Sequence, residues 1–173
     1  MIYKELNIEQ AERIREIDGE CYIHKAWREV NGKRELVVID WTDNELPNGV
    51  SWHIEHFKKS LLNGGRAIGC FNNDILIGYL VINSNIFGDS SKYVLLDQLF
   101  ISKNYRNKGI GKNLFDLGTK LAKEFTAEKI YICAGSSEDT IGFYFKLGCI
   151  EATEVNKELY ELDKNDYQLE YIL

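Results

Sequence analysis

The sequence predicts a single domain of the α/β class, in which helices and strands share one hydrophobic core. The chain has 173 residues, of which 45% are hydrophobic, so it can bury one sizeable core and is short for two domains. Runs with helical spacing of apolar residues alternate with runs typical of strands. In the middle of the chain, a strand-like run at 95–101 leads through a glycine turn into a helical pattern at 110–125. We therefore expect one domain over residues 1–173.

The N-terminal part contains two predicted helices and one long segment without a pattern. Apolar or small residues recur at helical spacing over 8–17, and Asn7 is suited to cap that helix. Residues 19–50 show no regular periodicity, and a stretch of this length is usually functional or mobile. A second helix is predicted over 51–62, with Ser51 as its cap and an Asn-Gly-Gly sequence at its end.

The rest of the chain is predicted to be richer in strands. A hairpin is expected around an Asn-Asn-Asp turn, because apolar strand-like runs flank it on both sides. The predicted elements are, in order, strands at 66–71, 75–83 and 95–101, a helix at 110–125, and strands at 129–134 and 167–172.

Charge and composition exclude several classes of protein. The formal charge of −6 disfavours a nucleic-acid-binding surface and favours cationic substrates. No apolar stretch approaches the length of a membrane span, and the N-terminus lacks the pattern of a signal peptide. We therefore expect a cytoplasmic protein with no nucleic-acid partner and no membrane association.

Cysteines and histidines indicate neither disulfides nor a metal site. The four cysteines are far apart and form no C-x-x-C pair, so free thiols are expected. His53 and His56 form an i, i+3 pair, but the third and fourth ligands that zinc requires are missing nearby. We interpret both as histidines on a helix surface.

Residues 105–112, with the sequence Tyr-Arg-Asn-Lys-Gly-Ile-Gly-Lys, predict an anion-binding turn. Gly109 and Gly111 have no Cβ and can adopt positive φ, so backbone N–H groups can converge on a ligand that approaches closely. The helix that follows adds its own unpaired N–H groups and the positive end of its dipole. Together these features favour a diphosphate site.

Two common phosphate-binding loops do not fit this segment. A P-loop requires Ser or Thr after Gly-Lys, and Asn113 stands there. A dinucleotide-binding fingerprint requires a third small residue where the chain has Leu114. The pattern that does match is Arg/Gln-x-x-Gly-x-Gly/Ala, at residues 106–111.

A second segment, Phe143-Tyr144-x-x-x-Gly148-Cys149, matches a Phe-Tyr-x-x-x-Gly-Phe pattern at the expected distance downstream. With both motifs, the chain resembles the GCN5-related N-acetyltransferase (GNAT) superfamily. It departs from the family pattern at Cys149, where an aromatic is usual, and at Ser137, where many members carry Asn. The resemblance implies an α/β (α+β) fold with a mixed, mostly antiparallel central sheet flanked by helices. Strands four and five of that sheet would be splayed to hold the cofactor.

The resemblance also implies acetyl-CoA as the acetyl donor and main-chain groups as its chief contacts. At the glycine turn we expect the Arg106 side chain to contact phosphate, whereas Lys108 and Lys112 act mainly through their N–H groups. Leu99 and Ile101 are equally explained by core packing, which leaves their backbone free for the cofactor. The residues carried over as cofactor-binding are Leu99, Phe100, Ile101, Arg106, Asn107, Lys108, Gly109, Ile110, Gly111, Lys112, Ser137 and Tyr144.

Tyr144 and Asp97 are the candidate catalytic residues. The resemblance implies that Tyr144 is the general acid for the departing thiolate, although a tyrosine in an apolar helix is often a core residue. Asp97 lies on the central strand and is the candidate general base, with Glu138 as the alternative. Period-two alternation would place Gln98 on the opposite face from Asp97.

The acceptor residues are the hardest to identify. Trp41, Asp40, Asp43 and Glu45 could line the acceptor mouth, since aromatic faces and carboxylates suit an ammonium group, but a solvated acidic loop explains them equally well. The predicted reaction is transfer of an acetyl group to a primary amine of a small molecule or peptide, directly in a ternary complex. No histidine near Cys133 or Cys149 in the sequence would activate a cysteine for a covalent route. A non-catalytic acyl-CoA-binding sensor or protein-interaction module is the alternative, and a homodimer is left open.

Overall fold

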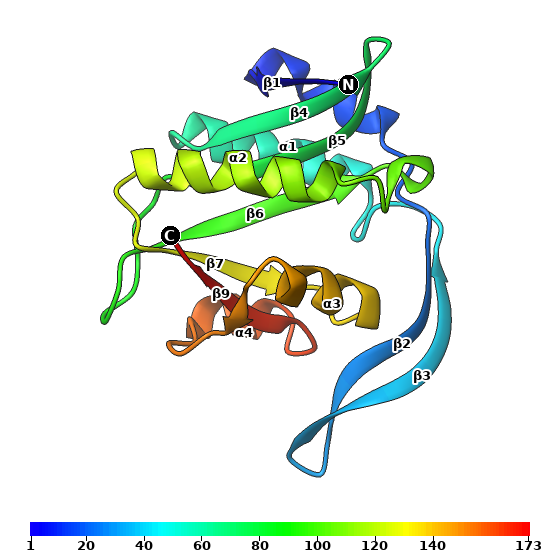
Figure 1. The fold of residues 1–173 in the computed structure, drawn as a ribbon, viewed down its shortest axis with the longest axis vertical. Coiled ribbons are helices and arrows are strands. Elements are labelled where there is room, and N and C mark those ends of the chain that lie inside the picture. Colours follow the sequence, from blue (N-terminus) through cyan, green and yellow to red (C-terminus); the bar gives the residue numbers. More distant parts are fainter.

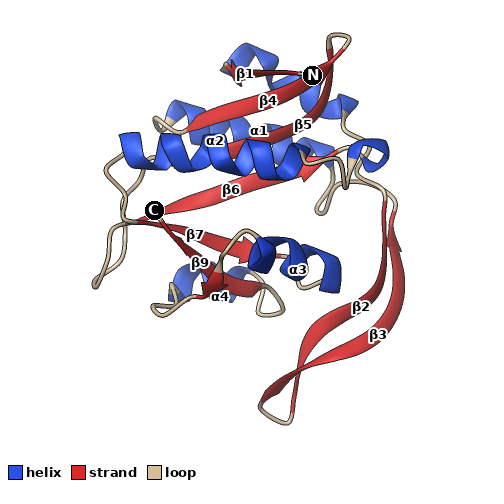
Figure 2. Ribbon diagram, viewed as in Figure 1, coloured by secondary structure: helices blue, strands red, loops and turns tan.

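The computed structural model describes residues 1–173 and contains two sheets. Seven strands form the central sheet in the order β1-β4-β5-β6-β7-β9-β8, and β2 pairs with β3 in a separate hairpin (Figures 1 and 2). The strands are β1 (Ile2–Leu6), β2 (Cys21–Val30), β3 (Lys33–Asp43), β4 (Arg66–Asn72), β5 (Ile75–Ile82), β6 (Tyr93–Ile101), β7 (Lys129–Ala134), β8 (Ile150–Glu151) and β9 (Tyr167–Ile172). The α-helices are α1 (Val50–Leu62), α2 (Ile110–Glu124), α3 (Glu138–Lys146) and α4 (Lys157–Leu162), and the 3₁₀ helices are η1 (Ile8–Glu16) and η2 (Lys103–Tyr105).

Helices cover both faces of the sheet, so it separates two hydrophobic cores. The larger core contains Leu114 of α2 and Tyr144 of α3, with apolar side chains from β4 to β7 and β9. The smaller core, on the opposite face, contains Ile14 of η1 and Phe57 of α1. Figure 1 shows α2 in front of β4 to β6 and α1 behind them. The apolar periodicities that predicted these helices therefore correspond to their buried faces.

The central sheet is mostly antiparallel, as expected, and is split between β6 and β7. These two strands form the one parallel pair, from Tyr93 opposite Lys129 to Leu96 opposite Ile132. Beyond Leu96, β6 pairs only with β5, and beyond Ile132, β7 pairs only with β9. Figure 2 shows the two strands diverging toward the hairpin. The predicted splay is confirmed, and it begins at Asp97.

The prediction that residues 19–50 are irregular is wrong, because β2 and β3 occupy most of that segment. Their two-residue turn, Asn31-Gly32, has positive φ at both positions, and Asn-Gly is the strongest local signal for such a turn. The two-stranded hairpin of β2 and β3 stands apart from the central sheet, and many of its side chains are exposed on both faces. Neither strand therefore shows the apolar alternation from which strands are usually recognised.

Smaller differences concern helix ends and short elements. Asn7 caps the first helix in a reciprocal arrangement with Gln10, as predicted, but that helix is of the 3₁₀ type. Ser51 is not the cap of α1, since that helix begins at Val50 after Gly49. The short elements β1, β8 and α4 were not predicted. None of the helices combines the length and the apolar character that crossing a bilayer would require.

Candidate active site

The turn before α2 presents six consecutive backbone N–H groups, from Asn107 to Lys112, that have no acceptor in the protein. The first helical hydrogen bond is made only by the next residue, Asn113, to the Gly109 carbonyl at 3.0 Å. Gly109 has φ +79° and Asn107 has φ +59°, so the chain alternates between left-handed and ordinary conformations there. Such alternation turns successive N–H groups toward a common point, at the positive end of the α2 dipole. The backbone thus has the unpaired N–H groups that the prediction of an anion-binding turn requires.

The side chain of Arg106 contacts backbone carbonyls at the end of β6 and just before β2. Its Nε donates to the Ile101 carbonyl at 3.0 Å, and its two terminal nitrogens donate to the carbonyls of Glu20 and Gly19 at 2.8 and 3.3 Å. Because these three carbonyls occupy the guanidinium, it joins the start of the hairpin to the end of β6. The motif arginine therefore forms a structural tie in this structure, and its contact with phosphate stays a prediction.

The lysines beside the turn also direct their side chains elsewhere. Lys108 donates to the Asn104 carbonyl at 2.8 Å, and Lys112 pairs with Asp116 at 2.5 Å on the surface of α2. These contacts agree with the expectation that both residues serve the turn mainly through their N–H groups.

The two motif glycines have different roles. A Cβ at Gly111 would lie 3.2 Å from the ring of Phe143, so this glycine allows α2 to approach α3 closely. A Cβ at Gly109 would meet nothing within 4 Å, and glycine is favoured there by its positive φ. Gly109, not Gly111, therefore sets the conformation of the turn.

The free edge of β6 continues from the turn into the splay. The Ser102 N–H donates to the Ile77 carbonyl of β5 at 2.9 Å, so alternation directs the N–H groups of Leu99 and Ile101 away from β5. Their side chains pack against the larger core, which reconciles the packing and cofactor interpretations of both residues. Phe100 differs from them, because its backbone faces β5 and its ring packs 4.7 Å from that of His53. The backbone N–H of Phe100 is therefore not on the free edge of β6, where those of Leu99 and Ile101 lie.

Tyr144 lies on α3 where the two strands separate. Its ring packs against Phe115 and Phe143, with centroids 6.4 and 5.1 Å away, and its hydroxyl has no hydrogen-bond partner in the protein. Burial, and to a smaller extent Cys149 and Cys133, raise the pKa of Tyr144 well above its ordinary value. The phenol is therefore protonated at neutral pH and can donate to a neighbour.

Ser137 caps α3, since its Oγ accepts the Thr140 N–H at 3.2 Å. This contact explains the residue without a cofactor. Glu138, the alternative base, is exposed in the first turn of the same helix.

Asp97 sits in a β-bulge at the point where β6 leaves β7. Val81 of β5 pairs with Gln98, but the next residue, Ile82, pairs with Leu96, so Asp97 is an extra residue in its strand. Bulges turn side chains away from the ordinary alternation. Asp97 consequently accepts a hydrogen bond from Ser60 of α1 at 2.9 Å. Burial raises the pKa of Asp97 above its ordinary value, against the opposing effect of this bond.

Because of the bulge, the prediction that Gln98 and Asp97 lie on opposite faces is wrong. Gln98 also faces α1, where its Oε1 accepts the Tyr79 hydroxyl at 2.8 Å and lies 3.4 Å from His53 Nδ1. His53 is only 2% exposed and its Nε2 lies 2.8 Å from the Pro47 carbonyl, so it is not a surface histidine. Burial lowers the pKa of His53, which is therefore neutral at neutral pH.

Cys133 of β7 connects the two candidate catalytic residues. Its thiol contributes to the raised pKa of Tyr144, and the carboxylate of Asp97 contributes to the raised pKa of Cys133. Asp97 and Cys133 are also the first residues of their strands beyond the last β6–β7 pair, Leu96 opposite Ile132. The pKa of Cys133 is about 12, mainly because of burial, and this thiol is not a nucleophile at neutral pH.

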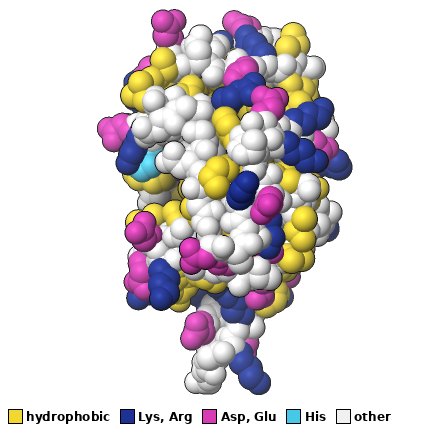
Figure 3. Space-filling view, turned by 90° about the vertical axis from the view of Figure 1, so that its left-hand side faces the viewer, with side chains coloured by type: hydrophobic (Ala, Val, Ile, Leu, Met, Phe, Trp, Pro, Cys, Tyr) yellow, Lys and Arg dark blue, Asp and Glu magenta, His cyan; other side chains and the backbone are white.

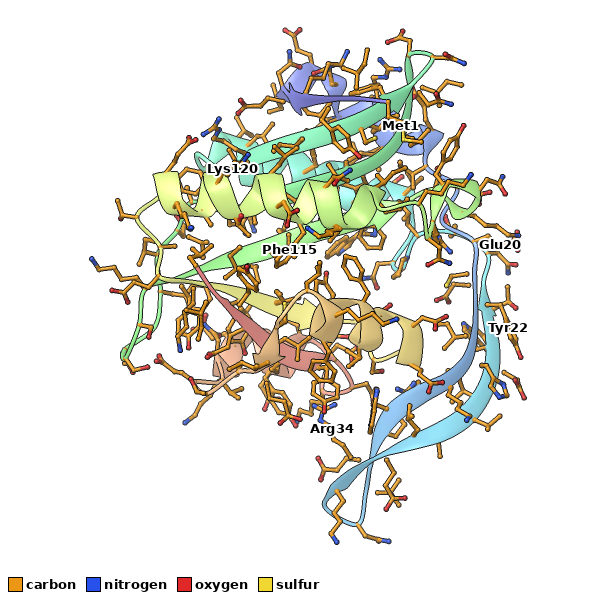
Figure 4. The ribbon with its side chains drawn as sticks, in the orientation of Figure 1. Met1, Glu20, Tyr22, Arg34, Phe115 and Lys120 are labelled. Carbon is orange, nitrogen blue, oxygen red and sulfur yellow. The ribbon has the colours of Figure 1, made fainter.

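The hairpin stands across the open end of the splay (Figures 1 and 4). Its start is tied to the end of β6 through Arg106. Further along, the Trp27 N–H donates to the Ser136 carbonyl at 2.8 Å, and Arg28 donates to the Ser136 Oγ at 2.6 Å, just before α3. The hairpin therefore forms a wall between the ends of β6 and β7.

The structure separates the four predicted acceptor residues. Asp40 lies at an irregularity of β3 and accepts hydrogen bonds from Tyr22 at 2.5 Å and His24 at 2.7 Å. Tyr22 points away from the rest of the chain in Figure 4. Trp41 instead pairs with Ile23 and donates to Asp43 at 2.7 Å, on the other face of the ribbon. Glu45 is exposed in the loop that follows.

Two groups at the splay were missed by sequence reasoning. Ser60 is a small polar residue on the buried side of an amphipathic helix, which was the only signal for it. Asp166 directly precedes β9, and burial followed by Asp163 raises its pKa to about 6. The carboxylate of Asp166 also contributes to the raised pKa of Cys133.

In Figure 3, basic and acidic side chains are interspersed on the visible face, without one large basic patch.

Comparison with solved structures identifies the same architecture in known acetyltransferases. Nourseothricin acetyltransferase superposes with a TM-score of 0.70 at 18% identity, covering 98% of this chain and 95% of that one. A protein assigned as a streptothricin acetyltransferase from Bacillus anthracis str. Ames, in complex with acetyl coenzyme A, gives 0.67 at 18% identity, with 99% and 98% covered. PaiA N-acetyltransferase from Thermoplasma acidophilum, in complex with coenzyme A, gives 0.61 at 18% identity, with both chains fully covered. At 18% identity, the similarity to these structures shows the fold alone.

The family itself is shown by the sequence. We found no significant match among curated proteins. The model of the acetyltransferase (GNAT) family, however, matches residues 12–149, which include the bulge, the turn and α3. The chain therefore belongs to the GNAT acetyltransferase family and is an acetyl-CoA-dependent acyltransferase.

Proposed function

We propose that the chain transfers the acetyl group of acetyl-CoA to a primary amine of a small molecule or peptide, directly in a ternary complex. The observation that carries this proposal is one continuous run of unpaired backbone groups, from the turn before α2 to the free edge of β6. Unpaired N–H groups of residues 107–112 lead into the free edge of β6, which ends beside Asp97 and Tyr144.

The residues present fit the donor. The N–H groups at 107–112 would hold its diphosphate, and those of Leu99 and Ile101 would hold the amide-containing arm, because both are aligned before binding. When bound, acetyl-CoA supplies an activated thioester carbonyl. A good thiol leaving group is thus provided by the donor, and the protein has to orient the amine and move two protons.

Asp97 is suited to remove a proton from the amine. An alkylammonium must lose a proton before it can attack a carbonyl, and a carboxylate with a raised pKa is a stronger base than an ordinary one. Asp97 projects from the start of the splay, on the face of the sheet that α1 covers. We assign it as the general base.

Tyr144 lies on α3, on the other face of the sheet, in the larger core. Its unpaired hydroxyl is protonated at neutral pH, because burial raises its pKa. It can therefore donate its proton to the departing thiolate. Base and acid then act from opposite faces of the sheet, which keeps the two proton transfers apart.

Direct transfer is supported by the state of the cysteines. The pKa of Cys133 and that of Cys149 are both about 12, chiefly because of burial. A covalent route through cysteine requires a thiolate, and neither thiol is ionised at neutral pH.

The acceptor side favours a cationic amine. Trp41 and Asp43 share one face of the hairpin wall, Asp97 follows the last β6–β7 pair, and Asp166 directly precedes the Tyr167–Ala134 pair of β9 and β7. The similar structures include proteins named for nourseothricin and streptothricin acetylation, which supports a small-molecule acceptor over a peptide. The cytoplasmic location and the homodimer stay predictions.

A panel of amines tests the proposal. Release of free CoA thiol is followed with a chromogenic disulfide, using aminosugars, polyamines, amino acids and a peptide with a free N-terminus. We expect thiol release that depends on the amine and an acetylated product detected by mass spectrometry. Asp97→Asn should lower the rate about 10² to 10⁴-fold, whereas the exposed alternative, Glu138→Gln, should not. Absence of turnover with every amine, in a protein that still binds acetyl-CoA, would favour a non-catalytic sensor.

A further inference from the structure

We propose that Ser60 of α1 is a positioning residue for the reaction, holding the carboxylate of Asp97 at the start of the splay on the face of the sheet that α1 covers. This inference rests on the proposed function, in which Asp97 is the base. Ser60 Oγ donates to Asp97 Oδ2 at 2.9 Å and is the nearest donor to that carboxylate. The second donor, Gln98 Nε2, lies 3.4 Å away.

A carboxylate in a β-bulge needs such a contact. Bulge residues lack a regular partner in the sheet, so their side chains are not fixed by alternation. Asp97 immediately follows Leu96, the last residue of β6 that pairs with β7. One hydrogen bond from a neighbouring element can therefore select its direction.

The helix that carries Ser60 is itself held firmly at this point. The Gly65 N–H donates to the Ser60 carbonyl at 2.8 Å, and a Cβ at Gly65 would lie 2.7 Å from that oxygen and 2.9 Å from the Ile82 carbonyl. Ile82 is the residue that pairs across the bulge with Leu96. Gly65 thus fixes the distance between α1, which carries the Ser60 hydroxyl, and the bulge that contains Asp97, as a positioning role requires.

The ionisable groups that face Asp97 come from three elements: His53 and His56 on α1, Tyr79 on β5 and Cys133 on β7. Burial raises the pKa of Tyr79 and of Cys133, so both are neutral at neutral pH, and His53 is neutral because burial lowers its pKa. Burial raises the pKa of Asp97, and the hydrogen bond from the Ser60 hydroxyl is the main influence that opposes this rise.

The test compares pH profiles of kcat/KM for the wild type, Ser60→Ala and Ser60→Thr. Without the hydroxyl the carboxylate loses a stabilising bond, so its pKa rises, and the acidic limb should move up by about one pH unit. Ser60→Thr keeps the hydroxyl and should restore the wild-type limb. Ser84→Ala is the matched control, because Ser84 Oγ donates to the Asn63 carbonyl at the end of the same helix and does not touch Asp97.

A ¹³C titration of the Asp97 carboxyl group gives a readout independent of turnover, and should show the same upward shift in folded Ser60→Ala. An unchanged carboxyl titration together with an unchanged acidic limb would overturn the role of Ser60, even if Asp97→Asn is inactive. Full turnover of Asp97→Asn would overturn the assignment of Asp97 as the general base, and with it the positioning role of Ser60. If the wild-type protein itself transferred no acetyl group to any amine, the proposed function would be contradicted instead.

Discussion

The two sides of the β6–β7 splay are made of different parts of the chain. On the proposed cofactor side, consecutive backbone N–H groups of one short segment, 107–112, would form the site, and the side chains of Arg106 and Lys112 are engaged elsewhere. On the acceptor side, the groups are side chains from separate elements, among them Asp97 of β6 and Trp41 of the hairpin. A site made of backbone needs only the correct turn, whereas a site made of side chains depends on long-range packing. The cofactor side should therefore tolerate side-chain substitutions that the acceptor side does not.

The largest effect is expected from Tyr144→Phe, which tests whether chemistry and cofactor binding are separate. The ring remains to fill its place in the core, so the Kd for acetyl-CoA should stay within about twofold, while kcat should fall about 10² to 10⁴-fold. Because burial raises the pKa of Tyr144 well above its ordinary value, the loss should be similar at pH 7 and pH 9. Steady-state kinetics at both pH values, with calorimetry for binding, measure this contrast. Normal kcat in the variant, with chemistry shown to be rate-limiting, would return Tyr144 to the role of a core residue.

Gly109→Ala tests the claim that the backbone conformation forms the cofactor site. A left-handed conformation costs a non-glycine residue about 1–2 kcal/mol, and rotation out of it would turn the N–H groups away. We expect the Kd for acetyl-CoA to rise about tenfold. Gly32→Ala is a matched control, because Gly32 has φ +76° in the hairpin turn and, like Gly109, no atom within 4 Å of an added Cβ. Equal affinity in both variants would remove the turn from the site.

The same division explains what could be predicted from the sequence. The anion-binding turn was predictable, because glycine spacing and the start of a helix encode it within a few residues. The Ser60–Asp97 contact was not, since it depends on a bulge that appears only when β5 is aligned with β6. For Arg106 the motif position was correct, but three carbonyls from distant residues determine where its side chain lies. The Asn31-Gly32 turn could have been predicted from its sequence, but it was missed because the strands on either side lack regular apolar alternation.

Asp166→Asn tests whether the acceptor side lowers stability. The pKa of Asp166 is about 6 in the folded protein, above its ordinary 3.8, so the ionised form is disfavoured by folding. The loss of folding stability caused by ionised Asp166 is absent below about pH 4, grows as the pH rises toward 6, and is complete above that. The substitution should therefore stabilise the protein at pH 8, by about 1 kcal/mol after allowance for solvent screening, and have little effect at pH 4. Urea unfolding at both pH values measures it, with the exposed Asp89→Asn as control. A stabilisation that did not depend on pH would have another cause.

The smallest effect is expected from Trp41→Ala, which tests the hairpin wall. Trp41 is 60% exposed, and a cation over an exposed aromatic ring gains about 0.5–1 kcal/mol. The KM for a cationic amine should rise about threefold, with kcat and the Kd for acetyl-CoA unchanged. Tyr22→Ala is the control, because Tyr22 is similarly exposed but lies on the opposite face of the ribbon. Equal effects of the two substitutions would show that the wall does not distinguish its faces.

The central claim, that backbone amides of one turn hold the donor, can be tested most directly by NMR. In a titration of ¹⁵N-labelled protein with acetyl-CoA, the amide resonances of 107–112 should shift downfield, and their exchange with solvent should slow, because free N–H groups acquire acceptors. The amides of the Asn31-Gly32 turn should not change. Binding that left residues 107–112 unperturbed would contradict the account and require a different site for the donor.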